Sequence, residues 1–254
     1  LAAALQARGR ECTVVIDTSN RLNADQAPVS DADVQAALSA QVRLEGEWDR
    51  YIRASRRRTV RGSAHSALRW LRRGWQRFAP PGKSMVERLL NIELAHQELL
   101  RQGIASRAPW ILILEDDAWS ANIDDLADGL TDLLERADVS VRFINLSESF
   151  DLSELGIKHL LGDSDCYWHG STTRAVLSAQ QPVTNTVCAI AYRSSFAEEL
   201  LAQYASMPMR PVVPIDWKLN RALMDMRATG SLGAGSCWWV VPGPIDQLSM
   251  RGDS

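Results

Sequence analysis

The chain has 254 residues, of which 46% are hydrophobic and 23% charged, as in globular proteins with one large domain or a domain and an appendage. The formal net charge of −3 argues against a general nucleic-acid-binding protein, so we expect no nucleic-acid partner. No apolar run approaches the roughly 18 residues that span a bilayer. The cysteines are far apart and lack CxxC spacing, which predicts reduced thiols in the cytoplasm; they are Cys12, Cys166, Cys188 and Cys237.

The amino-terminal part is predicted to hold a helix and then a strand that ends in polar residues. An Ala- and Leu-rich start ends at Gly9, which suits a helix C-terminal cap. The β-branched run Cys12–Ile16 indicates a strand, and Asp17 follows it directly. Asp17 is a candidate contact for the hydroxyls or base edge of a nucleotide, with capping of a turn or helix as the alternative. Another helix is predicted from Val34 onward.

The compositional outlier is the segment Arg50–Arg77, which is rich in arginine and nearly free of acids. Tryptophans and arginines interleave between Leu68 and Phe78, a pattern that suits an amphipathic helix. We predict that residues 45–82 form an Arg- and Trp-rich helical insertion within a single domain spanning 1–254. Three roles are open for it: peripheral contact with an anionic membrane at its inner face, a groove for an anionic acceptor or partner, or a solvated insertion.

The strongest chemical signal is the stretch Trp110–Trp119, which follows a predicted helix that ends at Gly103. Its apolar run Ile111–Leu114 indicates a buried strand. The next three residues are acids, which cannot remain unpaired in a core; they are Glu115, Asp116 and Asp117. The strand must therefore emerge at the edge of a sheet, where open α/β sheets bind ligands. Such oxygen donors suit Mg²⁺ or Mn²⁺ beside a diphosphate, whereas the alternative is a solvated acidic turn.

Strands and helices alternate after the acids, which predicts an α/β sheet flanked by helices. The polar segment Ser147–Thr173 is predicted to be irregular. The elements predicted from apolar patterns are the helix Ile123–Arg136, the strands Val139–Asn145, Val187–Tyr192 and Cys237–Val241, and a helix that begins near Asp216.

In this order the pieces resemble the GT-A nucleotide-sugar glycosyltransferases, in particular glycosyltransferase families 25 and 2. The acids 115–117 after their strand resemble the DxD-type motif in its EDD form. The segment Pro214–Arg221 is similar to the one that carries the general base in many inverting family 2 enzymes. The ending Trp239–Ser249 is similar to that of family 25 domains. The resemblance covers most of the chain from about Ser84 onward, and it implies a GT-A (Rossmann-like) fold with a mixed, mostly parallel central sheet.

The resemblance implies a metal-dependent glycosyltransferase that moves a sugar from a nucleotide-sugar donor to a glycan, lipid-linked or small-molecule acceptor. A UDP-sugar is the leading choice of donor. Mn²⁺ or Mg²⁺ would be held by Asp117 and Glu115, and Asp116 would orient the donor. Asp216 would be the catalytic base, with helix capping as its alternative.

Three tryptophans are candidate faces for the acceptor sugar, although each also suits a core; they are Trp217, Trp238 and Trp239. The rival class of function is a catalytically inactive GT-A-like module that binds a carbohydrate or a partner. Phosphoryl chemistry on the same acids is disfavoured because Ala118 and Trp119 follow them instead of an Asp-x-Asp-x-Thr pattern.

The amino-terminal part departs from the family pattern. The first strand is missing or lies upstream of Leu1, so Val14–Asp17 is either the second strand of a family 2 pattern or the first of a family 25 pattern. Asp17 resembles a nucleotide-base contact in the first case only. The segment Arg50–Arg77 has no counterpart in either family.

Overall fold

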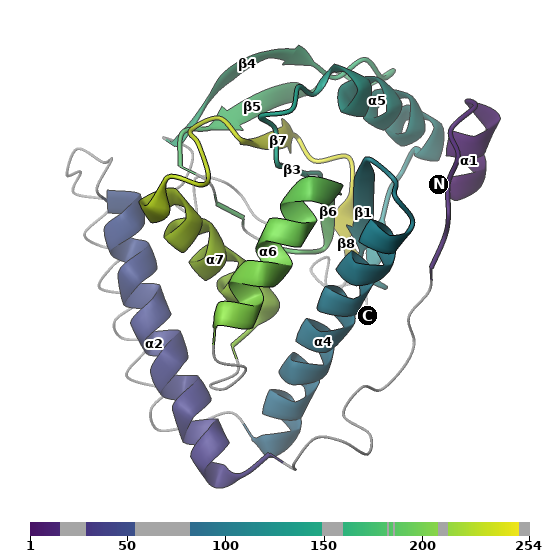
Figure 1. Cartoon of the computed structure of the whole chain (residues 1–254). Coiled ribbons are helices and arrows are strands. Elements are labelled where there is room, and N and C mark those ends of the chain that lie inside the picture. The colour runs from purple at the N-terminus through teal and green to yellow at the C-terminus, as the bar shows by residue number, and fades with distance from the viewer. Residues whose placement is uncertain are drawn as a thin grey trace.

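The computed structural model describes residues 1–15, 29–53, 82–148, 160–181, 183–184, 186–207 and 213–248. Within them a six-stranded sheet lies between helices, which confirms the α/β class (Figure 1). The helices are α1 (Ala2–Ala7), α2 (Asp31–Arg53), α4 (Lys83–Ala105), α5 (Ile123–Arg136), α6 (Ser194–Ser206) and α7 (Ile215–Thr229). The strands are β1 (Trp110–Leu114), β2 (Ala118–Trp119), β3 (Phe143–Asn145), β4 (Leu161–Tyr167), β5 (Ala175–Ala179), β6 (Ala189–Arg193), β7 (Cys237–Val241) and β8 (Asp246–Gln247).

The strand order of the sheet is β1-β6-β3-β7-β5-β4, and β2 and β8 form a separate two-stranded ladder. Only β3 and β7 run parallel among these described strands; the other pairings are antiparallel. The prediction of a mostly parallel sheet is therefore not confirmed. Its physical basis was weak, because a strand that is buried on both faces is apolar throughout in either orientation. The sequence of β6 is an example, since four of its five residues are buried.

Two hydrophobic cores lie on opposite faces of the sheet, as the alternation of side chains along a strand requires. The first core is covered by α4, α6 and α7, which contribute Leu100, Phe196 and Leu223. The second is covered by α5, which contributes Leu126, Leu130 and Leu133. Figure 1 shows α6 and α7 in front of the sheet and α5 near β4 and β5.

Several predicted elements are confirmed in detail. The bounds of α5 and β7 agree with the prediction, and the helix predicted from Val34 runs without a break to Arg53. The structure differs in the segment predicted to be irregular, which contains β4. This strand is polar and lies at the edge of the sheet, so it lacks the apolar signal of a central strand. Residues 11–15 form no strand, and Val14 and Val15 are exposed.

The predicted insertion 45–82 is described only in part. Residues 45–53 belong to α2, which packs on α7 through a T-shaped contact between Trp48 and Trp217 at 6.1 Å. Residues 54–81 lie outside the described residues, so the membrane contact through Arg50–Arg77 and the single-domain organisation stay predictions. In the part of the chain that is described, no helix is both long and apolar enough to cross a bilayer.

His96 is a buried polar residue on the core-facing side of α4. Its Nε2 lies 3.2 Å from the hydroxyl of Tyr192 on β6, and only 5% of the residue is exposed. Burial lowers the pKa of its imidazole from 6.5 to about 4. The folded protein therefore holds a neutral histidine at pH values where the unfolded chain holds a charged one.

This histidine makes stability depend on pH. We expect its contribution to the free energy of unfolding to be complete above pH 6.5 and to fall by about 3 kcal/mol as the pH drops to 4, because only the unfolded state binds the proton in that window. Urea denaturation of the wild type and of a His96→Gln variant across this range measures the effect. The carboxylates titrate in both proteins, so their contributions cancel in the difference between the two free energies of unfolding. A difference in stability that stays constant from pH 7 to pH 4 would contradict the expectation.

Candidate functional site

The acidic turn, residues Glu115, Asp116 and Asp117, begins where β1 leaves the sheet. The N–H of Glu115 donates to the carbonyl of Cys188 at 2.9 Å, which extends the β1–β6 ladder by one step. The N–H of Ala118 then donates to the carbonyl of Glu115 at 3.1 Å and closes the turn. The strand therefore emerges at Glu115, as the cost of burying three acids requires.

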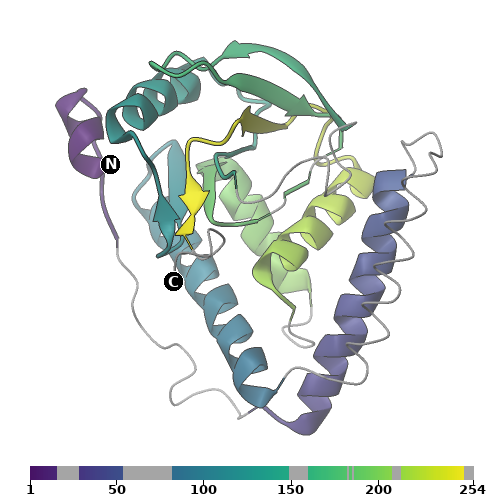
Figure 2. The same ribbon diagram turned by 180° about the vertical axis from the view of Figure 1, so that it is seen from behind.

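The carboxy-terminal strand β8 contacts the acidic turn and holds it in place. β8 pairs antiparallel with β2, and Figure 2 shows the two short strands side by side. Gln247 Nε2 donates to Glu115 Oε2 at 3.1 Å, so its amide fixes the orientation of that carboxylate. The N–H of Leu248 donates to the carbonyl of Asp117 at 3.0 Å. Ser249, the last residue of the family-like ending, lies outside the described residues.

The path of the chain into β8 depends on a close backbone contact at Gly243. A Cβ atom at this position would lie 2.5 Å from the backbone nitrogen of Glu148, which is too close for any side chain. Two backbone hydrogen bonds continue the contact. Ile245 donates to Leu146 at 3.1 Å and Glu148 donates to Ile245 at 2.8 Å. Glycine therefore lets this segment lie against the chain after β3 and directs β8 toward the acidic turn.

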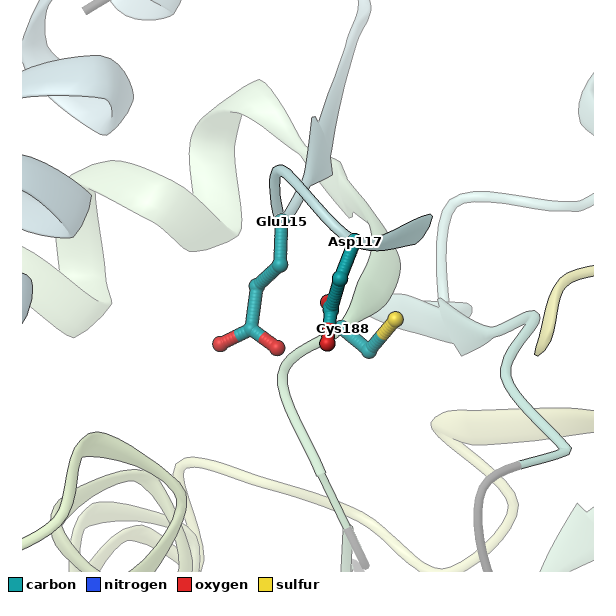
Figure 3. Close-up of side chains that lie close together, drawn as sticks. All are labelled: Glu115, Asp117 and Cys188. Carbon is teal, nitrogen blue, oxygen red and sulfur yellow. The ribbon is translucent and has the colours of Figure 1, made fainter. Parts of the chain in front are cut away.

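The structure brings Glu115 and Asp117 together with a third side chain, that of Cys188. One donor atom from each of the three lies within 4.8 Å of the other two (Figure 3). The two acids are partly buried, whereas Cys188 is fully buried. Asp116 is exposed. The three consecutive acids thus differ in environment, and the two that were predicted to hold a metal are the ones that converge.

Asp216 is the second residue of α7. Its negative charge contributes to the raised pKa of Glu115, which is about 7. Burial is the largest cause of that rise, followed by the charges of Asp117, Asp216 and Asp116. Burial also raises the pKa of Asp216 itself to about 6, and hydrogen bonds from its own N–H and from that of Trp217 oppose the rise. The N-cap of α7 is Pro214, so Asp216 lies in the first turn of the helix and not at the cap, and its carboxylate adds to the negative charge that acts on Glu115.

The segment before Cys188 is tied to α7 by buried polar contacts. The N–H of Thr184 donates to Asn220 Oδ1, and Asn220 Nδ2 donates to the carbonyl of Thr184, both at 2.9 Å. Asn145 of β3 donates to the hydroxyl of Thr184 at 3.1 Å. The N–H of Cys188 donates to the hydroxyl of Thr186 at 3.1 Å. Buried hydrogen bonds of this kind hold the chain in one arrangement, so Cys188 has a fixed place beside the acids.

Two of the three tryptophans predicted to face an acceptor sugar, Trp238 and Trp239, are packing residues. Trp238 and Trp239 are 7% and 1% exposed and enter the cores on opposite faces of the sheet. Trp217 is partly buried against Trp48 of α2. The correction has a simple cause, because β7 is a central strand whose two faces are both covered. An exposed tryptophan beside the turn is Trp119 of β2, at 37%. Asp17 lies outside the described residues.

The donor set fits a divalent cation. Carboxylate oxygens are the ligands of Mg²⁺ and Mn²⁺, and a thiolate is a ligand of softer transition metals. Donors bound to one ion lie within about 4.5 Å of one another, since each is about 2.0–2.3 Å from it. The donor atoms of the three side chains lie within 4.8 Å of one another, so small side-chain movements would bring them to the separation that one ion requires. Neither a protein-family model nor a curated protein sequence matches the chain.

Sequence reasoning missed Cys188 as a member of this cluster. The residue directly precedes β6, and β6 is the antiparallel neighbour of β1, with Leu114 opposite Ala189. A correct pairing of these two strands would have placed Cys188 beside Glu115. The sequence alone carries no signal for that pairing, because β1 and β6 are far apart along the chain, with other strands between them in the sequence.

Proposed function

We propose that this chain is a metal-dependent glycosyltransferase of the GT-A type, which transfers a sugar from a nucleotide-sugar donor, with a UDP-sugar as the first choice. The acceptor is a glycan, a lipid-linked acceptor or a small molecule with a free hydroxyl. The observation that carries the proposal is the convergence of Glu115 and Asp117, whose carboxylate oxygens lie within 4.8 Å of each other where β1 leaves the sheet. The charge of Asp216, at the start of α7, also acts on Glu115, which supports Asp216 as the candidate base.

The residues divide the chemistry between them. A divalent cation held by Glu115 and Asp117 supplies Lewis-acid stabilisation of the negative charge on the departing nucleotide. Gln247 holds the carboxylate of Glu115 in place. Asp216, whose pKa is about 6, is ionised at neutral pH and accepts the proton of the acceptor hydroxyl. Asp116 is exposed at the rim of the turn, where it is available to the donor.

The electrostatics support the binding of a cation. Burial and three neighbouring carboxylates raise the pKa of Glu115, which means that negative charge is concentrated at this place at an energetic cost. A divalent cation relieves this repulsion, and a diphosphate then supplies further oxygen ligands. A solvated acidic turn, the alternative weighed from the sequence, would leave the carboxylates apart and exposed.

The test is nucleotide release from a panel of nucleotide sugars with Mn²⁺, with Mg²⁺ and with a chelator. We expect metal-dependent release from at least one donor, and an Asp216→Asn variant should lower kcat by about 10²–10⁴-fold because it removes the base. Mn²⁺ binding by the variant, measured by calorimetry, should stay close to that of the wild type. Asp225→Asn is the matched control, because Asp225 lies on the same helix and pairs with Arg221.

Two results would contradict the proposal. One is release that is unaffected by the chelator and by Asp216→Asn. The other is binding of a glycan without release from any donor, which would favour the catalytically inactive binding module.

A further inference from the structure

Cys188 stands out among the cysteines because of what surrounds it. Its thiol belongs to the one group of three potential metal ligands found within the described ranges, together with Glu115 and Asp117. Cys237 offers a comparison, since it is equally buried but lies in the other core with the hydroxyl of Ser236 3.8 Å from its sulfur. A buried cysteine usually serves as a small apolar residue. At position 188 that role does not explain two carboxylates that each have an oxygen within 4.8 Å of its sulfur.

We propose that Cys188 is a third protein ligand of the cation at the acidic turn, and that its thiolate makes the site prefer Mn²⁺, Co²⁺ or Zn²⁺ to Mg²⁺. This inference rests on the proposed function in taking the turn as a cation site. On binding, the thiol releases its proton to solvent and the sulfur donates an electron pair to the ion. The ligand set is then two oxygens and one sulfur, with the remaining positions open to water or to the diphosphate of the donor.

The geometry favours a thiolate ligand from this position. Glu115 and Cys188 are joined by the backbone hydrogen bond that ends the β1–β6 ladder, so their side chains start from adjacent strands. Figure 3 shows the side chains of Glu115, Asp117 and Cys188 gathered on one side of the turn. Thr184 is hydrogen-bonded to α7 and β3, and the hydroxyl of Thr186 accepts from the N–H of Cys188, so these contacts fix the backbone that carries the sulfur. A site whose ligands are already positioned loses little conformational entropy when the ion binds.

The two oxygens and one sulfur of the site determine its preference for transition metals over Mg²⁺. Mg²⁺ requires oxygen ligands in near-octahedral geometry and keeps several waters, so a sulfur ligand contributes nothing to its binding. First-row transition metals accept mixed oxygen and sulfur ligands, and their affinities rise from Mn²⁺ to Co²⁺. The sulfur should therefore increase the affinity for Co²⁺ and leave that for Mg²⁺ unchanged.

Titration of the chelator-treated protein with Co²⁺ tests the inference without reference to activity. We expect a sulfur-to-cobalt charge-transfer band in the near-ultraviolet as the ion binds. A Cys188→Ser variant should lose this band and bind Co²⁺ at least about tenfold more weakly, since even outer-shell partners of a metal contribute that much. Its affinity for Mg²⁺ should equal that of the wild type. Cys166→Ser is the matched control, because that partly buried cysteine of β4 is not part of the cluster, and it should keep the band.

The outcomes separate this inference from the proposed function. Co²⁺ binding without the band, or a band that survives Cys188→Ser, would overturn the role of Cys188 and leave the metal-dependent transferase intact. Failure of the wild type to bind Co²⁺ or Mn²⁺ would overturn both. If Cys188→Ser does not fold, Cys188→Ala, which introduces no polar group into the core, replaces it with the same expected results.

Discussion

Replacing Asp117 with asparagine is expected to lower metal-dependent nucleotide release on the order of 10³-fold. Asparagine keeps the size of the side chain but removes the charge that would bind the proposed cation. The fold should be retained, because the contact between this residue and β8 is made by its backbone carbonyl, which accepts from Leu248. Removal of one like charge beside Glu115 should even raise the melting temperature slightly, as is common when a functional site is neutralised.

The measurement combines the Kd for Mn²⁺ with the rate of nucleotide release at saturating Mn²⁺. Asp116→Asn is the matched control, since that residue is adjacent in sequence but exposed. It should keep the affinity for Mn²⁺ and change only the KM for the donor. An Asp117→Asn variant that binds Mn²⁺ as tightly as the wild type would show that the cation site lies elsewhere.

The second large effect is expected at the ion pair between Lys218 of α7 and Glu93 of α4. Only 6% and 1% of their side chains are exposed, Gln97 donates to the same carboxylate at 3.0 Å, and the ammonium group lies 5.6 Å from the centre of the Tyr204 ring. Lys218→Met should destabilise the protein by about 3–5 kcal/mol at pH 7, because it leaves a buried carboxylate without its cation.

A matched double variant separates loss of the pair from loss of packing. In Glu93→Leu/Lys218→Met both charges are gone, and most of the stability should return. Urea denaturation at pH 7 gives the free energies of unfolding of the wild type, of Lys218→Met and of the double variant. Equal destabilisation of the single and double variants would contradict this account and point to packing of the lysine side chain instead. Lys218 lies two residues after Asp216 in the first turn of α7, so its pair with Glu93 of α4 also fixes the position of that turn.

The sequence predicted those parts of the fold that depend on local pattern. The strongly amphipathic Ile123–Arg136 gave correct helix bounds, and the apolar run Cys237–Val241 gave a correct strand. The emergence of the acids at Glu115 also followed from local physics, since three carboxylates cannot share a core. These features require no knowledge of what lies across the sheet.

Features that depend on tertiary neighbours could not be predicted. The orientation of β6 against β1 decides which residue faces Glu115, and no local pattern encodes it. The same holds for Trp238 and Trp239, whose burial follows from the central place of β7 in the sheet. Gln247 was noticed only as part of a family-like ending, and its contact with Glu115 became apparent from the pairing of β8 with β2.

The short ladder of β2 and β8 has a thermodynamic consequence for the site. Two residue pairs are too few to be stable alone, so this ladder should open locally at a lower free energy than the central sheet. Opening separates Gln247 from Glu115 and Leu248 from the backbone of Asp117. The apparent affinity of the acidic turn is then its intrinsic affinity multiplied by the fraction of molecules in which the ladder is closed. Binding of the proposed cation and docking of the carboxy-terminal segment would thereby be linked, and each would stabilise the other to the same extent.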